Sequence, residues 1–112
     1  MRKYLESDML KFMAEQMAKT ITIRTYDEKG NSNDENRPAT KEEQKIIYNI
    51  AYGALHTLNY GKQMRSSKDM TQAVIDNAEM TLDLFIPDCN GYDTIYCPLQ
   101  AIIREWEEDT ND

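Results

Sequence analysis

The chain has few of the residues on which metal sites, disulfide frameworks and many hydrolases depend. Among 112 residues there is one histidine, His56, and there are two cysteines, Cys89 and Cys97. The cysteines are eight positions apart without a C-x-x-C pair, and a zinc site needs about four ligands, so we expect no metal site. We expect both thiols to be free, as in a reducing cytosol. With one histidine, mechanisms that use His–His or Ser–His–Asp geometry are nearly excluded.

Long hydrophobic runs are also missing. No apolar run approaches the roughly 18 residues that cross a bilayer. The first ten residues, MRKYLESDML, contain acidic side chains before any apolar segment forms, which argues against a signal peptide. We therefore expect no membrane contact and a cytoplasmic location, in the host cytosol if the chain is encoded by a phage.

Sequence motifs of catalysis and nucleotide binding are absent as well. The chain has no G-x-S-x-G, H-E-x-x-H or G-x-G-x-x-G pattern, and no P-loop spacing. We expect a protein that is not an enzyme, with no catalytic residues and no cofactor.

Basic residues are scarce in the second part of the chain. Residues 1–69 carry 12 basic and 10 acidic side chains, whereas residues 70–112 carry Arg104 against ten acidic ones, a net charge of −9. A negative field of that size repels nucleic acid phosphates and attracts basic protein surfaces. The alternative is that these acids only keep the outer helix faces soluble.

The residues that are present favour a mainly α fold. Apolar residues recur with helical periodicity in four segments. We predict one compact four-helix domain over residues 1–112 with helices at about 3–18, 41–60, 67–85 and 98–108. The last residues, 107–112, are predicted to be an acidic frayed tail.

Several helix ends have clear local signals. Thr40 and Glu43 form a capping box at the start of the second helix. Gly61 is predicted to end that helix, and Ser66 or Ser67 to cap the third. Pro87 is predicted to stop the third helix.

Two segments are predicted to be extended or irregular. Residues 20–26 alternate β-branched and polar positions, which favours a short strand, although continuation of the first helix competes. A two-stranded element would pair 20–26 with 94–97. Residues 27–39 are rich in Gly, Asn, Asp and Ser and are predicted to be an exposed polar loop.

The helix faces lead to two packing predictions. Gly53 lies inside the second helix at a cost of about 1 kcal/mol relative to Ala, so we expect a neighbouring backbone to approach it closely. The predicted buried stripe of the third helix comprises Met70, Val74, Ala78, Leu82 and Phe85.

An aromatic ridge and a basic link form one candidate site. Tyr48, Tyr52, His56 and Tyr60 recur every fourth position on the second helix, which is also how aromatics that merely flank a core are spaced. The link at 62–68 precedes a helix N-terminus, where anions bind favourably. A phosphate or nucleotide ligand would use Tyr52, His56, Tyr60, Lys62, Arg65, Ser67 and Lys68.

The acidic residues form the other candidate site. Asp76, Glu79 and Asp83 are three and four residues apart and share one helix face. The predicted partner-binding residues are Asp76, Glu79, Asp83, Glu105 and Glu108.

These observations favour a small acidic inhibitor or adaptor that occupies a basic protein partner. Such proteins are used by mobile elements, viruses among them, to block nucleic acid-binding or defence proteins of a host. We expect no direct nucleic acid binding, and the Tyr and Trp residues exceed what so small a bundle buries, which allows a homo-oligomer. The alternative is a nucleotide- or phosphate-binding module.

Overall fold

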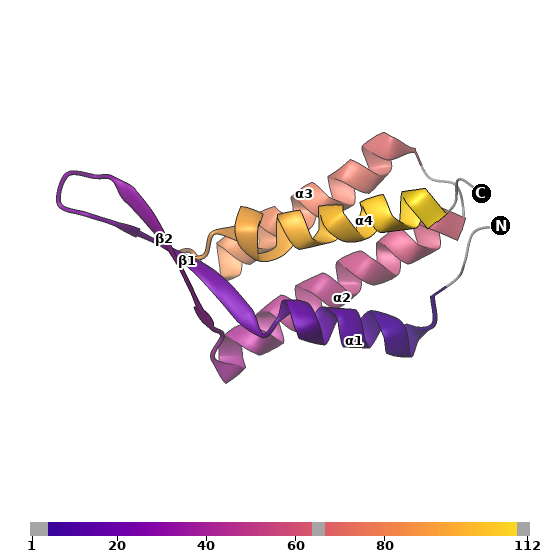
Figure 1. The fold of residues 1–112 in the computed structure, drawn as a ribbon, viewed down its shortest axis with the longest axis horizontal. Coiled ribbons are helices and arrows are strands. Elements are labelled where there is room, and N and C mark those ends of the chain that lie inside the picture. Colours follow the sequence, from indigo (N-terminus) through magenta and orange to yellow (C-terminus); the bar gives the residue numbers. More distant parts are fainter. Residues whose placement is uncertain (1–4, 64–66, 110–112) are drawn as a thin grey trace.

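The computed structural model describes residues 5–63 and 67–109. Within these residues the chain forms four α-helices, one two-stranded antiparallel sheet and one π-helical turn. The helices lie side by side and a β-hairpin projects from one end of them (Figure 1). In chain order the elements are α1 (Ser7–Met17), β1 (Thr20–Tyr26), β2 (Ser32–Pro38), α2 (Lys41–Gln63), α3 (Lys68–Phe85), η1 (Tyr92–Tyr96) and α4 (Cys97–Asp109). The mainly α fold with a small β element is therefore confirmed.

Helix α2 is the central element of the helical body. It packs against α1 on one side and against α3 on another; η1 packs against α3, and α4 packs against η1. The largest fully buried side chains come from every helix and from β1: Leu10, Ile21, Ile47, Leu55, Ile75, Leu82, Ile95 and Leu99. Burying each such aliphatic side chain stabilises the fold by about 1.5–3 kcal/mol, so this shared core holds the helices together.

Most predicted helix ends are confirmed. The Thr40 hydroxyl accepts a hydrogen bond from the Glu43 backbone N–H at 3.2 Å, and Glu43 Oε1 accepts one from the Thr40 N–H at 2.9 Å. Ser67 caps α3 through its Oγ, which accepts from the Met70 N–H at 3.2 Å. The predicted end at Gly61 is wrong, because α2 continues to Gln63. The first helix begins at Ser7, later than the predicted start at residue 3; residues 3 and 4 lie outside the described residues. The predicted frayed tail is wrong for residues 107–109, which belong to α4, and residues 110–112 lie outside the described part.

The strand at 20–26 is confirmed, but its predicted partner is wrong, and the predicted loop at 27–39 is wrong for residues 32–38, while residues 27–31 form an exposed turn. Residues 32–38 form β2, which pairs antiparallel with β1 from Thr20↔Pro38 to Tyr26↔Ser32. All of β2 except Arg37 is exposed, so the strand has no need of apolar residues and shows none. Backbone pairing rather than burial specifies it. The hairpin contributes to a long axis of 53 Å against 27 and 21 Å for the others (Figure 1).

Residues 94–97 lie in η1 and at the start of α4 instead of in a strand. The outer edge of β1 is covered by the 88–90 segment, where the Arg24 N–H donates to the Asp88 carbonyl and the Asn90 N–H donates to the Thr22 carbonyl, both at 2.8 Å. Thr94 does contact β1, but its hydroxyl accepts from the Thr22 N–H at 3.1 Å. The predicted proximity of the two segments was therefore correct and the predicted backbone ladder was not.

Candidate interaction surfaces

The three acidic residues predicted on the third helix share one side of α3, where Asp76 and Asp83 are exposed and Glu79 is half-buried. Asp76 Oδ1 accepts from the Gln72 side chain at 3.0 Å, and Asp83 Oδ1 accepts from the Gly91 N–H at 3.1 Å. The pKa of Glu79 is raised, first by partial burial and then by the negative charges of Asp83 and Asp76. The three carboxylates are therefore close enough to repel one another.

The fold adds two carboxylates that sequence spacing did not select. The side-chain amide of Asn90 donates to Asp34 Oδ2 at 3.0 Å and to Asp93 Oδ2 at 2.9 Å, which joins the hairpin to η1. Since Asp83 holds the adjacent Gly91, these groups continue the row on α3. We call this set the acidic surface: Asp34, Asp76, Glu79, Asp83 and Asp93.

Little positive charge balances the acidic surface. Arg24 Nε lies 3.3 Å from Asp34 Oδ1, but no ion pair within the described residues engages the other four carboxylates. The second ion pair in this part of the chain joins Arg37 to Glu43 at 2.7 Å, near the start of α2. The acidic surface is thus mostly uncompensated.

Glu105 and Glu108 are not shown to belong to this surface. Gln100 of α4 faces α3, because its side chain donates to Gln72 at 2.8 Å. Glu105 is five residues further, roughly 140° around the helix from Gln100. The side chain of Glu108 lies outside the described part of the structure.

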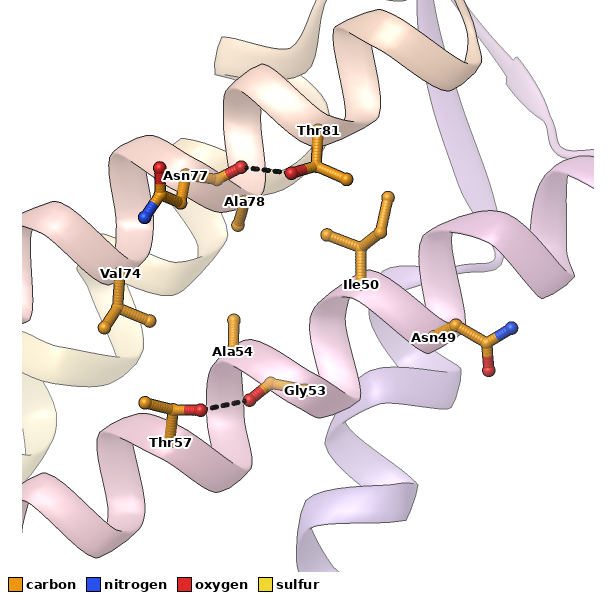
Figure 2. A pocket seen from close by; sticks show the side chains of 9 residues that line it. All are labelled: Asn49, Ile50, Gly53, Ala54, Thr57, Val74, Asn77, Ala78 and Thr81. Atoms are coloured by element: carbon orange, nitrogen blue, oxygen red, sulfur yellow. Dashed lines mark hydrogen bonds between the residues drawn. The ribbon is translucent and has the colours of Figure 1, made fainter.

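An uncharged groove runs between α2 and α3 (Figure 2). Its volume is about 360 Å³, and its lining residues carry no ionisable group: Asn49, Ile50, Gly53, Ala54, Thr57, Val74, Asn77, Ala78 and Thr81. Ile50, Ala54, Val74 and Ala78 point into the space between the two helices (Figure 2). The groove therefore offers a small, mainly apolar surface.

Gly53 opens onto this groove, which overturns the prediction of a closely packed neighbour. A Cβ atom added at Gly53 would have no atom within 4 Å. The prediction failed because α3 packs beside the glycine instead of over it, and Gly53 is exposed. The sequence does contain a related signal: residues 46–61 include no Asp, Glu, Lys or Arg in a chain that is 29% charged.

Large apolar side chains of α3 stand exposed around the groove. Met70 and Phe85, which we predicted to be buried, are 61% and 66% exposed, and Met80 and Leu84 are 63% and 78% exposed. The buried side of α3 consists instead of Ile75, Ala78 and Leu82. We call the groove together with Met70, Met80 and Leu84 the α2/α3 face.

The aromatic ridge is partly a packing feature. The Tyr48 and Tyr52 rings stack with centroids 5.9 Å apart, and His56 lies 6.1 Å from Tyr52 at an angle of 47°. Both tyrosines are half-buried against the core, whereas His56 and Tyr60 are exposed. The ridge therefore exists, with its inner half serving the core.

In the basic link at 62–68, few of the predicted ligand-binding groups are both described and free to bind a ligand. The Ser67 hydroxyl is engaged by the Met70 N–H as the cap of α3. Lys68 is exposed in the first turn of α3. The side chain of Lys62 and all of Arg65 lie outside the described residues.

The described part of the chain contains neither a candidate metal site nor a disulfide. Residues 5–63 and 67–109 contain no group of three or more His, Cys, Asp or Glu side chains placed to hold a metal ion. Cys89 and Cys97 are free thiols, the first buried and the second exposed. Burial raises the pKa of Cys89, whose Sγ lies 3.3 Å from the Thr94 hydroxyl.

No helix in the described residues is both long enough and apolar enough to span a membrane. Comparisons with protein-family models, curated proteins and solved structures give no match to this chain.

Proposed function

We propose that this chain is a non-enzymatic binding protein whose acidic surface occupies a basic surface of a partner protein. The observation that carries the proposal is the set of carboxylates at Asp76, Glu79, Asp83 and Asp93, for which the described residues provide no ion-pair partner. The raised pKa of Glu79 reflects its burial and the repulsion by Asp83 and Asp76. A cationic group placed against them would relieve that repulsion.

The type of partner follows from the same charges. A row of carboxylates on a rigid helix presents negative groups at spacings of roughly 5–6 Å. Such a row competes with nucleic acid phosphates for Lys and Arg side chains on a third molecule. This supports an inhibitor or adaptor directed at a nucleic acid-binding or defence protein, as mobile elements use.

The alternative, a phosphate-ligand module, has less support. Its helix N-terminus at Ser67 is already capped by the serine hydroxyl. The acidic surface on the same helix gives a phosphate an unfavourable field. Inorganic phosphate or a nucleotide is therefore expected to leave the melting temperature unchanged.

A capture experiment with two charge-matched variants tests the main proposal. Glu79→Lys/Asp93→Lys changes the acidic surface, and Asp83 is left in place because it holds the Gly91 N–H. Glu15→Lys/Glu28→Lys changes the net charge equally at exposed positions on α1 and in the hairpin turn. Each protein, checked for fold by circular dichroism, is used to capture proteins from the native host lysate for identification by mass spectrometry.

We expect the wild type and the Glu15/Glu28 variant to enrich the same basic protein, and the Glu79/Asp93 variant to lose it. The capture is expected to weaken as salt rises, because exposed charges are screened. Equal capture by all three proteins would contradict the proposal.

A further inference from the structure

The α2/α3 face carries both a depression and projections. The groove is lined by small residues such as Gly53, Ala54 and Ala78. Beside it Met80 and Leu84 project from α3 with 63% and 78% of their surface exposed. In a two-fold symmetric dimer the same patch is used by both copies. The patch must therefore contain both the projecting side chains and the depression into which those of the other copy fit.

We propose that two copies of this chain form a dimer through the α2/α3 face. The inference is independent of the basic partner and concerns a different part of α3. Glu79 lies about 100° around the helix from Met80, away from the groove. The dimer therefore leaves Glu79 and Asp93 of the acidic surface accessible, whereas Asp76 and Asp83 lie at the edge of the contact.

The charge distribution permits a second copy to occupy this face. The chain carries a net charge of −7, so two copies repel each other except where both surfaces are neutral. The nine groove residues and the exposed Met70, Met80 and Leu84 contain no charged side chain. Depletion of charge at the centre of a patch, with Met enriched, is typical of protein interfaces.

The α3 margin of this face is acidic, whereas the α2 margin includes the basic residue Lys45. Asp76 and Asp83 border it on α3, one helical turn from Met80. Lys45 and His56 border it on α2, next to Asn49 and Gly53 respectively. A two-fold axis along the helices would place α3 of one copy over α2 of the other and bring unlike margins together. An axis across the helices would place acid against acid.

The positions of these side chains along the helix axes agree with that arrangement. Helices α2 and α3 run antiparallel, with Thr81 near Ile50 and Val74 near Ala54 (Figure 2). Counting along the helices from these neighbours, Asp83 lies within about three residues of the level of Lys45, and Asp76 lies within about four residues of the level of His56. The two-fold axis would therefore bring Asp83 near Lys45 and Asp76 near His56 of the other copy.

Gly53 provides room for the approach of the second α3. A Cβ at this position would touch nothing in one copy, so the glycine is not required by the packing of its own chain. Helix axes pack at roughly 8–10 Å, with the shorter distances where small residues meet. Close approach of the second copy would explain why a glycine, which is unfavourable in the middle of a helix, occupies this position.

Sedimentation velocity and light scattering of the whole chain test the dimer. At about 100 μM we expect twice the chain mass of 13.1 kDa, because the interface must be stronger than roughly micromolar to be filled there. Leu84→Asp puts a charge into the contact and is expected to raise the dissociation constant by at least about tenfold. Phe12→Asp, at a 56% exposed position on α1, is the matched control and is expected to leave it unchanged.

A charge exchange tests the orientation. His56→Glu places two acids together and is expected to weaken the dimer, and His56→Glu/Asp76→Lys is expected to restore it. Circular dichroism must show the same helical content for every variant. A wild-type monomer at about 100 μM, equal effects of Leu84→Asp and Phe12→Asp, or no rescue by the exchange would each overturn the proposal.

Discussion

At the scale of single residues, two glycines have opposite roles. A Cβ at Gly91 would lie 3.1 Å from the Glu79 carbonyl oxygen and closer still to the Asp83 carboxylate. A Cβ at Gly53 would meet nothing within 4 Å. Gly91 is therefore required by the fold of one chain, and Gly53 is not.

Gly53→Ala is expected to raise the free energy of unfolding of the monomer by about 1 kcal/mol, the helix-propensity difference between the two residues. Urea denaturation measures this at a protein concentration where sedimentation shows a monomer. Gly91→Ala serves as the comparison and is expected to lower the stability. A loss of stability in both variants would show that the groove at Gly53 is filled within one chain.

Glu43 is expected to make the stability depend on acidic pH. Arg37 donates two hydrogen bonds to its carboxylate, at 2.7 and 2.9 Å, and lowers the pKa from 4.5 to about 2 with help from the Thr40 N–H. A lowered folded-state pKa stabilises the fold above the unfolded value of 4.5, and that stabilisation is lost as pH falls toward 2.

Glu43→Gln is therefore expected to be less stable than wild type at pH 6 and to lose less stability between pH 5 and about pH 2. Urea titrations across this range measure both slopes. Parallel slopes for the two proteins would mean that the Arg37–Glu43 pair does not stabilise the folded state.

At the scale of elements, helices were predictable and β2 was not. Cap chemistry at Thr40 and Ser67 is local, so the sequence alone places those helix starts. The strand β2 lacks apolar alternation because almost all of it is exposed, and its pairing with β1 depends on a turn and on backbone bonds. Propensity arguments weigh side chains and therefore miss such a strand.

Asp27 is expected to hold the hairpin turn. Its carboxylate accepts from the Lys29 N–H at 2.9 Å and from the Asn31 N–H at 2.8 Å, and Gly30 adopts a φ of 83° in the same turn. Asp27→Ala removes these bonds, so the outer end of the hairpin is expected to open more often.

Hydrogen exchange followed by NMR measures this opening. The amides of Thr25 and Asn33, which are paired in the ladder, are expected to exchange faster, while those of buried Ile47 and Leu55 keep their rates. Faster exchange throughout the helices would show that the hairpin supports the whole fold.

At the scale of the whole molecule, the two candidate surfaces differ in how far the sequence predicts them. Spacing alone places Asp76, Glu79 and Asp83 on one side of a helix. Asp34 and Asp93 join them only because Asn90 connects the hairpin to η1. The α2/α3 face exists because one side of each helix remains uncovered in the fold. The sequence of α3 has two apolar sides, and periodicity alone does not show which of them is buried.

The central claim is that the acidic surface contacts a basic partner. Carboxyl-to-amine crosslinking of the captured complex, with mass-spectrometric mapping, tests it most directly. We expect partner lysines to be linked to Glu79 or Asp93, with Glu15 and Glu28 unlinked. Crosslinks at Glu15 or Glu28, with none on the acidic surface, would contradict the account.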